Sequence, residues 1–244
     1  MVKSDVISPP LSDCLHCPMR AHSIFALLTP TEIVQMQLDV PDLHVKGDTV
    51  LYRQGDPARY AYTLRAGTVK LQAAPHQSKD QPHTIRLLRH GDLLGFEGLT
   101  LNRHSHTAVT IGETDLCQLD LAELSAYSQK YPAIKNAIYA RWQNALQEAE
   151  TQLLELGAKK AEARIAAFLC RWCSVFPDGT SVPFPLNRND LSEYLGLSTE
   201  HVSRWMAHFK RENLVHENKG SLKIDYVRLM KISQKDTSSK PYRA

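Results

Sequence analysis

Apolar residues near the C-terminal end of the chain recur with helical spacing in two short neighbouring segments. In the first segment, Leu191, Tyr194 and Leu195 stand at i, i+3 and i+4, which predicts a short helix with one buried face. Gly196 follows and supplies the left-handed backbone that a tight helix stop needs. Taken alone, this pattern predicts either a helix-turn-helix or an ordinary helical hairpin.

The second of these helices, which Ser198 or Thr199 can cap, has two contrasting faces. Its inward positions are apolar and its outward positions are polar or small: Val202, Trp205, Met206 and Phe209 turn inward, whereas Glu200, Ser203, Arg204 and Ala207 turn outward. Arginine can donate two hydrogen bonds to guanine, glutamate can accept one from the cytosine amino group, and serine can do either. The outward stripe therefore carries groups that can meet base edges, and Thr199 and His201 are further candidates for DNA contact.

A β-hairpin is predicted directly after the second helix. Short apolar runs lie on both sides of Asn218, Lys219 and Gly220, which is a hairpin signal. A hairpin in this place makes a winged helix, with Lys219 and Lys223 available for phosphate contact. The charge distribution agrees, because residues 187–244 hold 11 Lys and Arg against 7 Asp and Glu, whereas residues 1–186 hold 18 against 19.

The N-terminal half has a different texture. Between about residues 43 and 121, short alternating runs are separated by glycines, often in Gly-Asp pairs, which predicts an antiparallel β-roll or jelly roll. Thr29 or Thr31 with Pro30 predicts the start of a short helix over 29–39. The expected fold is α+β, with five segments in order: a leader over 1–28, a β-roll sensor domain over 29–130, a long helix over 131–158, a winged-helix domain over 159–234, and a flexible tail over 235–244.

The long helix is predicted from Pro132 to about Gly157, with a further helix over 159–176. One series of its side chains follows the 3-4 spacing of a coiled coil: Ile138, Trp142, Ala145, Ala149, Gln152 and Leu156. The helix therefore either pairs with the same helix of a second chain or packs only on its own β-roll. Pairing suits a DNA-binding protein, because two reading helices on a two-fold axis reach half-sites about one helical turn apart.

Composition places the chain among ordinary globular proteins. No apolar run approaches the roughly 20 residues that span a bilayer, and the N-terminal stretch lacks the apolar segment of a signal peptide. Five cysteines, an odd number, argue against a secreted disulfide framework. The sequence predicts a cytoplasmic protein with reduced thiols and no membrane partner.

Three segments carry a resemblance to a known family. They are GDLLGFEGL at 91–99, KKAEARIAAFL at 159–169 and NDLSEYLGLSTEHVSRW at 189–205. Together with the β-roll, long helix and winged helix, they resemble the CRP/FNR superfamily of bacterial transcription regulators, and within it the FNR branch. The resemblance implies a homodimer that binds an inverted repeat of TTGAT-type half-sites through Glu200, Ser203 and Arg204 and that has RNA polymerase as a partner.

The same resemblance argues against cyclic AMP as the effector. Cyclic AMP receptors of this fold place a glutamate after the roll glycine and an Arg-Ser pair on the following segment. Here Phe96 follows Gly95, and His106 and Thr107 stand near the second site. Without an arginine, a buried phosphate lacks its fork-shaped partner.

FNR-type oxygen sensors hold a [4Fe-4S] cluster with three N-terminal cysteines and a fourth on the β-roll. Cys14 and Cys17 match the first two positions and Cys117 matches the fourth. Ser23, or Phe25 in the wider variant, stands where the third cysteine is needed. Iron-sulfur clusters normally take four cysteines, so the ligand set is incomplete.

Four other readings of these residues stay open. Cys14 and Cys17 have the spacing of a dithiol switch. Zinc is offered Cys14, Cys17, His22 and Cys117, provided that the leader folds onto the roll. Cys17 followed by Pro18 resembles a haem-regulatory dipeptide. The plainest reading is free thiols, with neighbouring apolar side chains packed on the roll: Met19, Ile24 and Phe25.

A cupin-like metal enzyme with an appended helical domain is the alternative class, because His104 and His106 have the spacing of two metal ligands. The glutamate that such a site needs is absent, since Thr110 and Ile111 occupy its place. We expect the histidine pair to decorate a loop and the protein not to be an enzyme. Cys170 and Cys173, among apolar neighbours on a predicted helix, are expected in the core.

Overall fold

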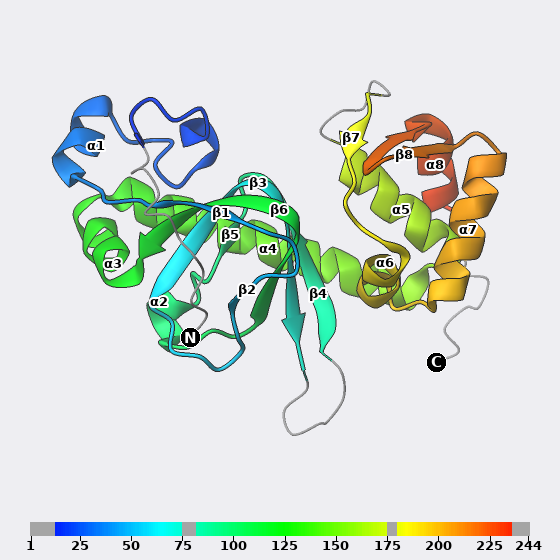
Figure 1. Cartoon of the computed structure of the whole chain (residues 1–244), viewed down its shortest axis with the longest axis horizontal. Helices are drawn as coiled ribbons and strands as arrows, with labels where there is room; N and C mark the ends of the chain where they lie inside the picture. The colour runs from blue at the N-terminus through cyan, green and yellow to red at the C-terminus, as the bar shows by residue number, and fades with distance from the viewer. Residues whose placement is uncertain (1–12, 75–81, 175–179, 236–244) are drawn as a thin grey trace, which may run out of the picture. The chain divides into compact units, whose positions relative to one another are not determined.

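The computed structural model describes residues 13–74, 82–174 and 180–235, which form two compact units, one up to Leu146 and one from Gln147 onward. Figure 1 shows a strand-rich unit and a helix-rich unit. Most of the expected leader, residues 1–12, and most of the expected tail, residues 236–244, lie outside the described residues.

The first unit is built on a six-stranded antiparallel sheet with a central path β1-β6-β3-β4. The two longest strands, β3 and β6, pair along most of their length, while β2 pairs with β6 and β5 with β3 (Figure 1). In chain order the elements are η1 (Arg20–His22), α1 (Pro30–Met36), β1 (Asp42–Val45), β2 (Val50–Tyr52), β3 (Tyr60–Ala73), β4 (His83–Leu88), β5 (Leu93–Leu94), α2 (Gly98–Leu101), β6 (Thr107–Asp120), α3 (Leu121–Lys130) and α4 (Pro132–Ala158).

Local signals explain where the short helices begin. Thr29 caps α1, and its side chain and that of Glu32 form a reciprocal capping box with Pro30 in the first turn. Asp120 ends β6 and caps α3 by accepting hydrogen bonds from the next two amides, at 2.8 Å and 3.3 Å. These caps fix the points at which the chain leaves the sheet.

The core of this unit includes the leader as well as the roll. Ile24, Phe25 and Leu28 are buried with Ile134 and Ile138 of α4 in one apolar cluster. Met19 is buried as well. The expectation that Met19, Ile24 and Phe25 pack on the roll is therefore confirmed, and the described part of the leader is a structural part of the sensor unit.

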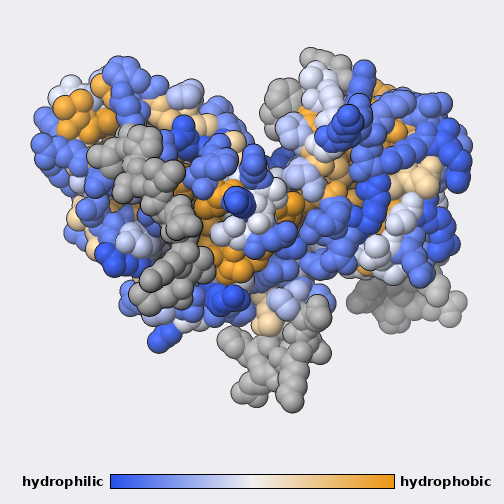
Figure 2. Space-filling view, viewed as in Figure 1, coloured by the Kyte–Doolittle hydropathy of each residue, from blue (hydrophilic) through white to orange (hydrophobic). Residues whose placement is uncertain are grey.

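The second unit combines helices with a small sheet of order β7-β9-β8. Its elements are α5 (Ala161–Cys173), β7 (Val182–Pro183), α6 (Arg188–Leu195), α7 (Thr199–Arg211), β8 (Val215–Asn218), β9 (Ser221–Ile224) and α8 (Tyr226–Ser233). Cys170 and Cys173 are both 2% exposed, as expected for core residues, and burial raises the pKa of Cys170 to about 11. The visible surface of this unit is mainly hydrophilic (Figure 2).

Candidate DNA interface and sensor residues

The turn between α6 and α7 follows the sequence signals closely. Asn187 caps α6, Gly196 ends it with φ +60°, and Ser198 caps α7 by accepting a hydrogen bond from the His201 amide at 3.2 Å. Thr199 is the first residue of α7, and its hydroxyl lies 3.2 Å from that of Ser192. The two helices are therefore joined by both a backbone stop and a side-chain contact.

The two faces of α7 differ sharply in burial. Val202, Met206 and Phe209 are fully buried, while Trp205 is only half-buried, so the inward face is narrower than expected. The stripe on the other side is exposed along its length: Glu200, Ser203, Arg204 and Ala207. Within the described part of the chain, the side chains of Glu200, Ser203 and Arg204 make no hydrogen bond or ion pair. They are therefore available to a ligand without breaking a contact of the fold.

The hairpin after α7 has the expected geometry of a wing. Asn218 of β8 pairs with Ser221 of β9, and Lys219 and Gly220 between them both have positive φ, as a two-residue type I′ turn requires. Lys219 and Lys223 are exposed. The wing thus presents two cations beside the exposed stripe's own helix unit.

An ion-pair network that the sequence did not reveal holds the wing to both helices of the turn. Glu217 of β8 accepts hydrogen bonds from Arg188 at 2.5 Å and 3.1 Å, and its carboxylate lies 2.6 Å from the Lys210 ammonium. Burial alone raises the pKa of Glu217, but the hydrogen bonds from Arg188 and Lys210 outweigh burial and hold this pKa below its ordinary value. Because Arg188 and Glu217 are 29 residues apart, no local pattern predicts the contact.

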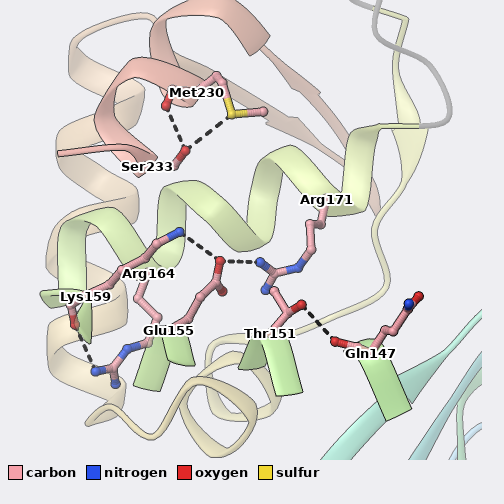
Figure 3. A network of polar contacts seen from close by, with 8 residues as sticks. All are labelled: Gln147, Thr151, Glu155, Lys159, Arg164, Arg171, Met230 and Ser233. Atoms are coloured by element: carbon pink, nitrogen blue, oxygen red, sulfur yellow. Dashed lines mark hydrogen bonds and ion pairs between the residues drawn. The ribbon is translucent and has the colours of Figure 1, made fainter. Parts of the chain in front are cut away.

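A second network fixes the C-terminal end of α4 within the winged-helix unit (Figure 3). Glu155 is 8% exposed and accepts hydrogen bonds from Lys159 at 2.8 Å and from Arg171 at 2.6 Å. Arg164 donates to the carbonyls of Leu156 and Lys159, which are the last unpaired carbonyls of the helix. The end of α4 is therefore held by charge-assisted hydrogen bonds rather than by a glycine stop at Gly157.

The expected pairing series on α4 is only half exposed. Ile138 is 3% exposed and belongs to the core of its own unit, Ala145 is half-buried, and Gln152 donates to the Tyr194 carbonyl at 2.7 Å. A different series with the same 3-4 spacing is exposed: Tyr139, Trp142, Leu146, Ala149, Leu153 and Leu156. This exposed stripe, the α4 seam, shares Trp142, Ala149 and Leu156 with the expected series and replaces Ile138 and Ala145.

The structure brings the three candidate sensor cysteines to one place. Cys14 and Cys17 of the leader and Cys117 of β6 line a single recess, which we call the thiol recess; its other lining residues are Met19, Arg20, Ser23, Phe25, Val40, Thr63 and Leu119. Cys117 pairs across the sheet with Asp42 and Thr63, and its Sγ lies 3.6 Å from the Asp42 carboxylate. Burial raises the pKa of Cys14 to about 11.

Ser23 has a structural task in this recess. Its hydroxyl donates to the Arg20 carbonyl at 2.9 Å and accepts from the Phe25 amide at 3.1 Å, and the residue is 9% exposed. Three thiols and an engaged hydroxyl do not supply the four thiolates of a [4Fe-4S] cluster.

The proposed zinc ligands are not assembled either. His22 is exposed and its ring packs against that of His90, with centroids 5.5 Å apart. Among the described residues, no group of three or more His, Cys, Asp or Glu side chains is arranged to hold a metal ion. The thiol recess is therefore a cluster of thiols rather than a preformed metal site.

The interior of the roll differs from expectation at His104. Its ring is buried and stacks on Tyr52, with centroids 3.7 Å apart, and its Nδ1 lies 3.5 Å from the Glu97 carboxylate. His104 therefore does not decorate a loop. His106 lies nearby and is half-buried, and burial is the main cause of its lowered pKa.

An arginine from a distant strand also reaches this interior. The charge of Arg86 on β4 acts on His106, and lowers its pKa further, while Glu97 opposes this effect. The sequence argument against cyclic AMP relied on the absence of an arginine at the family's usual position. Arg86 supplies a cation from another direction, and only the pairing of β3 with β4 places it there.

Comparison with known proteins identifies both units. Residues 42–131 match the family model of the cyclic nucleotide-binding domain, and residues 163–232 match that of the Crp-like helix-turn-helix domain. A sensor-type domain joined to a DNA-binding domain defines the class of one-chain transcription regulators.

Individual relatives point to one family within that class. The chain is 28% identical to the fumarate and nitrate reduction regulatory protein of Vibrio cholerae over 88% of this chain and 87% of the relative. It is 27% identical to electron transport regulator A of Shewanella oneidensis, over 83% and 82% of the two chains. The structure of FixK2 from Bradyrhizobium japonicum has the same fold, with a TM-score of 0.72, 22% identity and coverage of 80% of this chain and 98% of FixK2.

The chain belongs to the CRP/FNR family of transcription regulators. The resemblance inferred from the sequence is therefore confirmed, and so is the expectation that the protein is a regulator rather than an enzyme. Among the described residues, no helix has the length and apolar character to cross a membrane.

Proposed function

We propose that this regulator binds an inverted repeat of TTGAT-like half-sites as a homodimer and that a redox or small-molecule signal in the N-terminal unit changes its affinity for DNA. The observation that carries the DNA part is the exposed stripe of α7. It presents an acceptor, a hydroxyl and a guanidinium at helical spacing from a rigidly capped helix: Glu200, Ser203 and Arg204.

The chemistry of this stripe suits the major groove. Arg204 can donate a pair of hydrogen bonds to guanine O6 and N7, Glu200 can accept from a cytosine amino group, and Ser203 serves either purpose. Thr199 and His201 lie in the first turn of the same helix, where residues approach the DNA backbone or base edges. Lys219 in the wing turn is suited to a phosphate.

The α4 seam supports the homodimer. Leu146 and Leu153 are 60% and 69% exposed and stand seven residues apart, with Ala149 between them. Exposed leucines at this spacing are costly in water and are covered when two such helices pack as a coiled coil. A two-fold pair of α7 helices then matches an inverted repeat.

The thiol recess and the interior of the roll support a signal in the N-terminal unit. The relatives are named for the regulation of electron transport and of fumarate and nitrate reduction, which favours a redox, oxygen or nitric oxide signal over cyclic AMP. The signal shifts the pairing along α4, and hence the spacing of the two reading helices. The regulator acts in the cytoplasm, where DNA and RNA polymerase, its proposed partners, are found.

The test combines binding with spectroscopy on the full chain. A purified sample is titrated onto a duplex with an inverted TTGAT repeat and onto a scrambled duplex of equal length, and protection of both half-sites with a preference for the repeat is the expected result. Equal affinity for the two duplexes contradicts the proposed operator. An absorption spectrum and metal analysis of an anaerobic preparation distinguish an iron-sulfur cluster, haem and zinc from metal-free thiol or ligand sensing.

A further inference from the structure

Two segments far apart in the chain contribute sulfur atoms to the thiol recess. Cys14 and Cys17 come from the leader turn that Asp13 caps, and Cys117 comes from the central strand β6. The leader is held against the roll by buried apolar side chains, so the sulfurs meet in the folded resting state and not only after a rearrangement.

One guanidinium lies within electrostatic range of all three sulfurs. Arg65 forms an ion pair with Asp42, the carboxylate that also contacts the Cys117 thiol. The charge of Arg65 acts on Cys14, and the charges of Cys17 and Cys117 act on Arg65. A cation beside a thiol stabilises the thiolate, which is the reactive form of cysteine.

Burial separates the roles of the three thiols. Because the pKa of Cys14 is raised to about 11, this thiol stays protonated at neutral pH and is a poor nucleophile. Cys17 of the leader and Cys117 of the sheet are then the pair that can react, and Cys14 remains beside them as a thiol for exchange.

We propose that the thiol recess is a peroxide-responsive switch in which Cys17 and Cys117 form a reversible disulfide that ties the leader to β6. The Cys17 thiolate attacks one oxygen of hydrogen peroxide, the O–O bond breaks, and the departing hydroxide takes up a proton and leaves as water. The Cys117 sulfur then attacks the sulfenic acid sulfur, the S–O bond breaks, and the hydroxide leaves with the Cys117 proton as a second water. Two thiols and one peroxide give one disulfide and two water molecules.

The bond has a route to the rest of the sensor unit. The carbonyl of His22, five residues beyond Cys17, accepts a hydrogen bond of 2.5 Å from Arg141 of α4. A disulfide at Cys17 fixes the leader turn from which this contact is made. This consequence for DNA binding rests on the proposed function, whereas the chemical step does not.

The chemical step is tested on the reduced full-length protein with one equivalent of hydrogen peroxide. The chain has five cysteines, so the number of titratable thiols in denaturant falls from five to three, and peptide mapping recovers a Cys17–Cys117 link that dithiothreitol reverses. The variants C17S and C117S lose the link, while C14S and the double variant C170S/C173S, as matched controls, keep it. A link between Cys14 and Cys17, a link between Cys170 and Cys173, or an unchanged thiol count overturns the inference.

The consequence for DNA is measured separately. The affinity of the wild type for the inverted repeat is expected to change by about fivefold or more on oxidation, the lower end of ordinary allosteric coupling, and that of C117S to stay constant. An affinity that is equal before and after formation of the disulfide overturns the switch. Failure of both forms to prefer the repeat refutes the proposed operator and leaves the thiol count as an independent result.

Discussion

Replacement of Arg204 by alanine tests the proposed reading of DNA most directly. The side chain is exposed on α7 and, within the described residues, makes no hydrogen bond or ion pair, so its removal leaves the fold intact. A bidentate arginine-guanine contact contributes about 1–3 kcal/mol of discrimination. Because a dimer presents Arg204 twice, the preference for the repeat over scrambled DNA falls by about 2–6 kcal/mol, or roughly 30-fold to 10,000-fold.

A control is needed because Arg204→Ala also removes a positive charge. Lys223→Ala removes the same charge from an exposed position of the wing, and it is expected to weaken both duplexes alike through lost phosphate contact. Both variants are titrated by fluorescence anisotropy onto the two duplexes at one fixed salt concentration. If Arg204→Ala leaves the ratio of the two affinities as high as in Lys223→Ala, the assigned role of Arg204 is wrong.

Three further predictions concern the α4 seam and the two ion-pair networks. Leu146→Glu places a charge in the seam and gives a monomer in sedimentation analysis, whereas Leu27→Glu, at a residue that is 74% exposed outside α4, leaves the dimer; a dimeric Leu146→Glu contradicts the seam. Glu155→Gln leaves two partly exposed cations uncompensated and lowers the unfolding free energy of the winged-helix unit by about 1–2 kcal/mol in urea, and an unchanged midpoint argues against the network. Since the pKa of folded Glu217 is lowered, its stabilisation is present above the unfolded pKa and lost as pH falls through the folded pKa; Glu217→Gln is therefore less stable than the wild type at pH 7 and equal to it in acid, and a constant difference refutes this linkage.

The winged helix could be predicted because its signals are local. The left-handed Gly196, the cap at Ser198 and the two-residue turn at Lys219 and Gly220 each act within a few residues, and each stands where the sequence placed it. The exposed stripe of α7 follows from the same helical period that buries Val202 and its neighbours. Short-range physics therefore determined most of the candidate DNA interface before tertiary contacts were known.

The register of the α4 seam could not be predicted in the same way. A helix that packs on its own roll on one side and on a second chain on the other carries apolar residues on both faces. Ile138 and Tyr139 each begin a 3-4 series that ends at Leu156, and only the burial of Ile138 among roll residues separates the two. Likewise, the positions of Arg86 and Glu217 depend on strand pairing and on a contact across 29 residues, which periodicity does not contain.

Ser23 shows how one substitution can change the chemistry of a site while preserving its shape. Its hydroxyl closes the turn between Arg20 and Phe25, whose buried side chain anchors the leader in the core. The turn that brings Cys14 and Cys17 toward Cys117 is thus held by hydrogen bonds and apolar packing, with no bound group required for the fold. We therefore expect Ser23 to be important for the order of the leader rather than for metal binding.

Ser23→Ala tests this interpretation, because it leaves the buried Phe25 amide without its hydrogen-bond acceptor. The cost of an unsatisfied buried amide is about 1–2 kcal/mol, so amide hydrogen exchange of the peptide over 20–28 is expected to accelerate by roughly 5-fold to 30-fold. Ser128→Ala is the matched control, since the Ser128 hydroxyl only donates to the Ser125 carbonyl and its loss leaves no amide unpaired. If exchange over 20–28 is as slow in Ser23→Ala as in Ser128→Ala, the hydroxyl does not hold the turn, and the leader must be ordered by something other than its own hydrogen bonds.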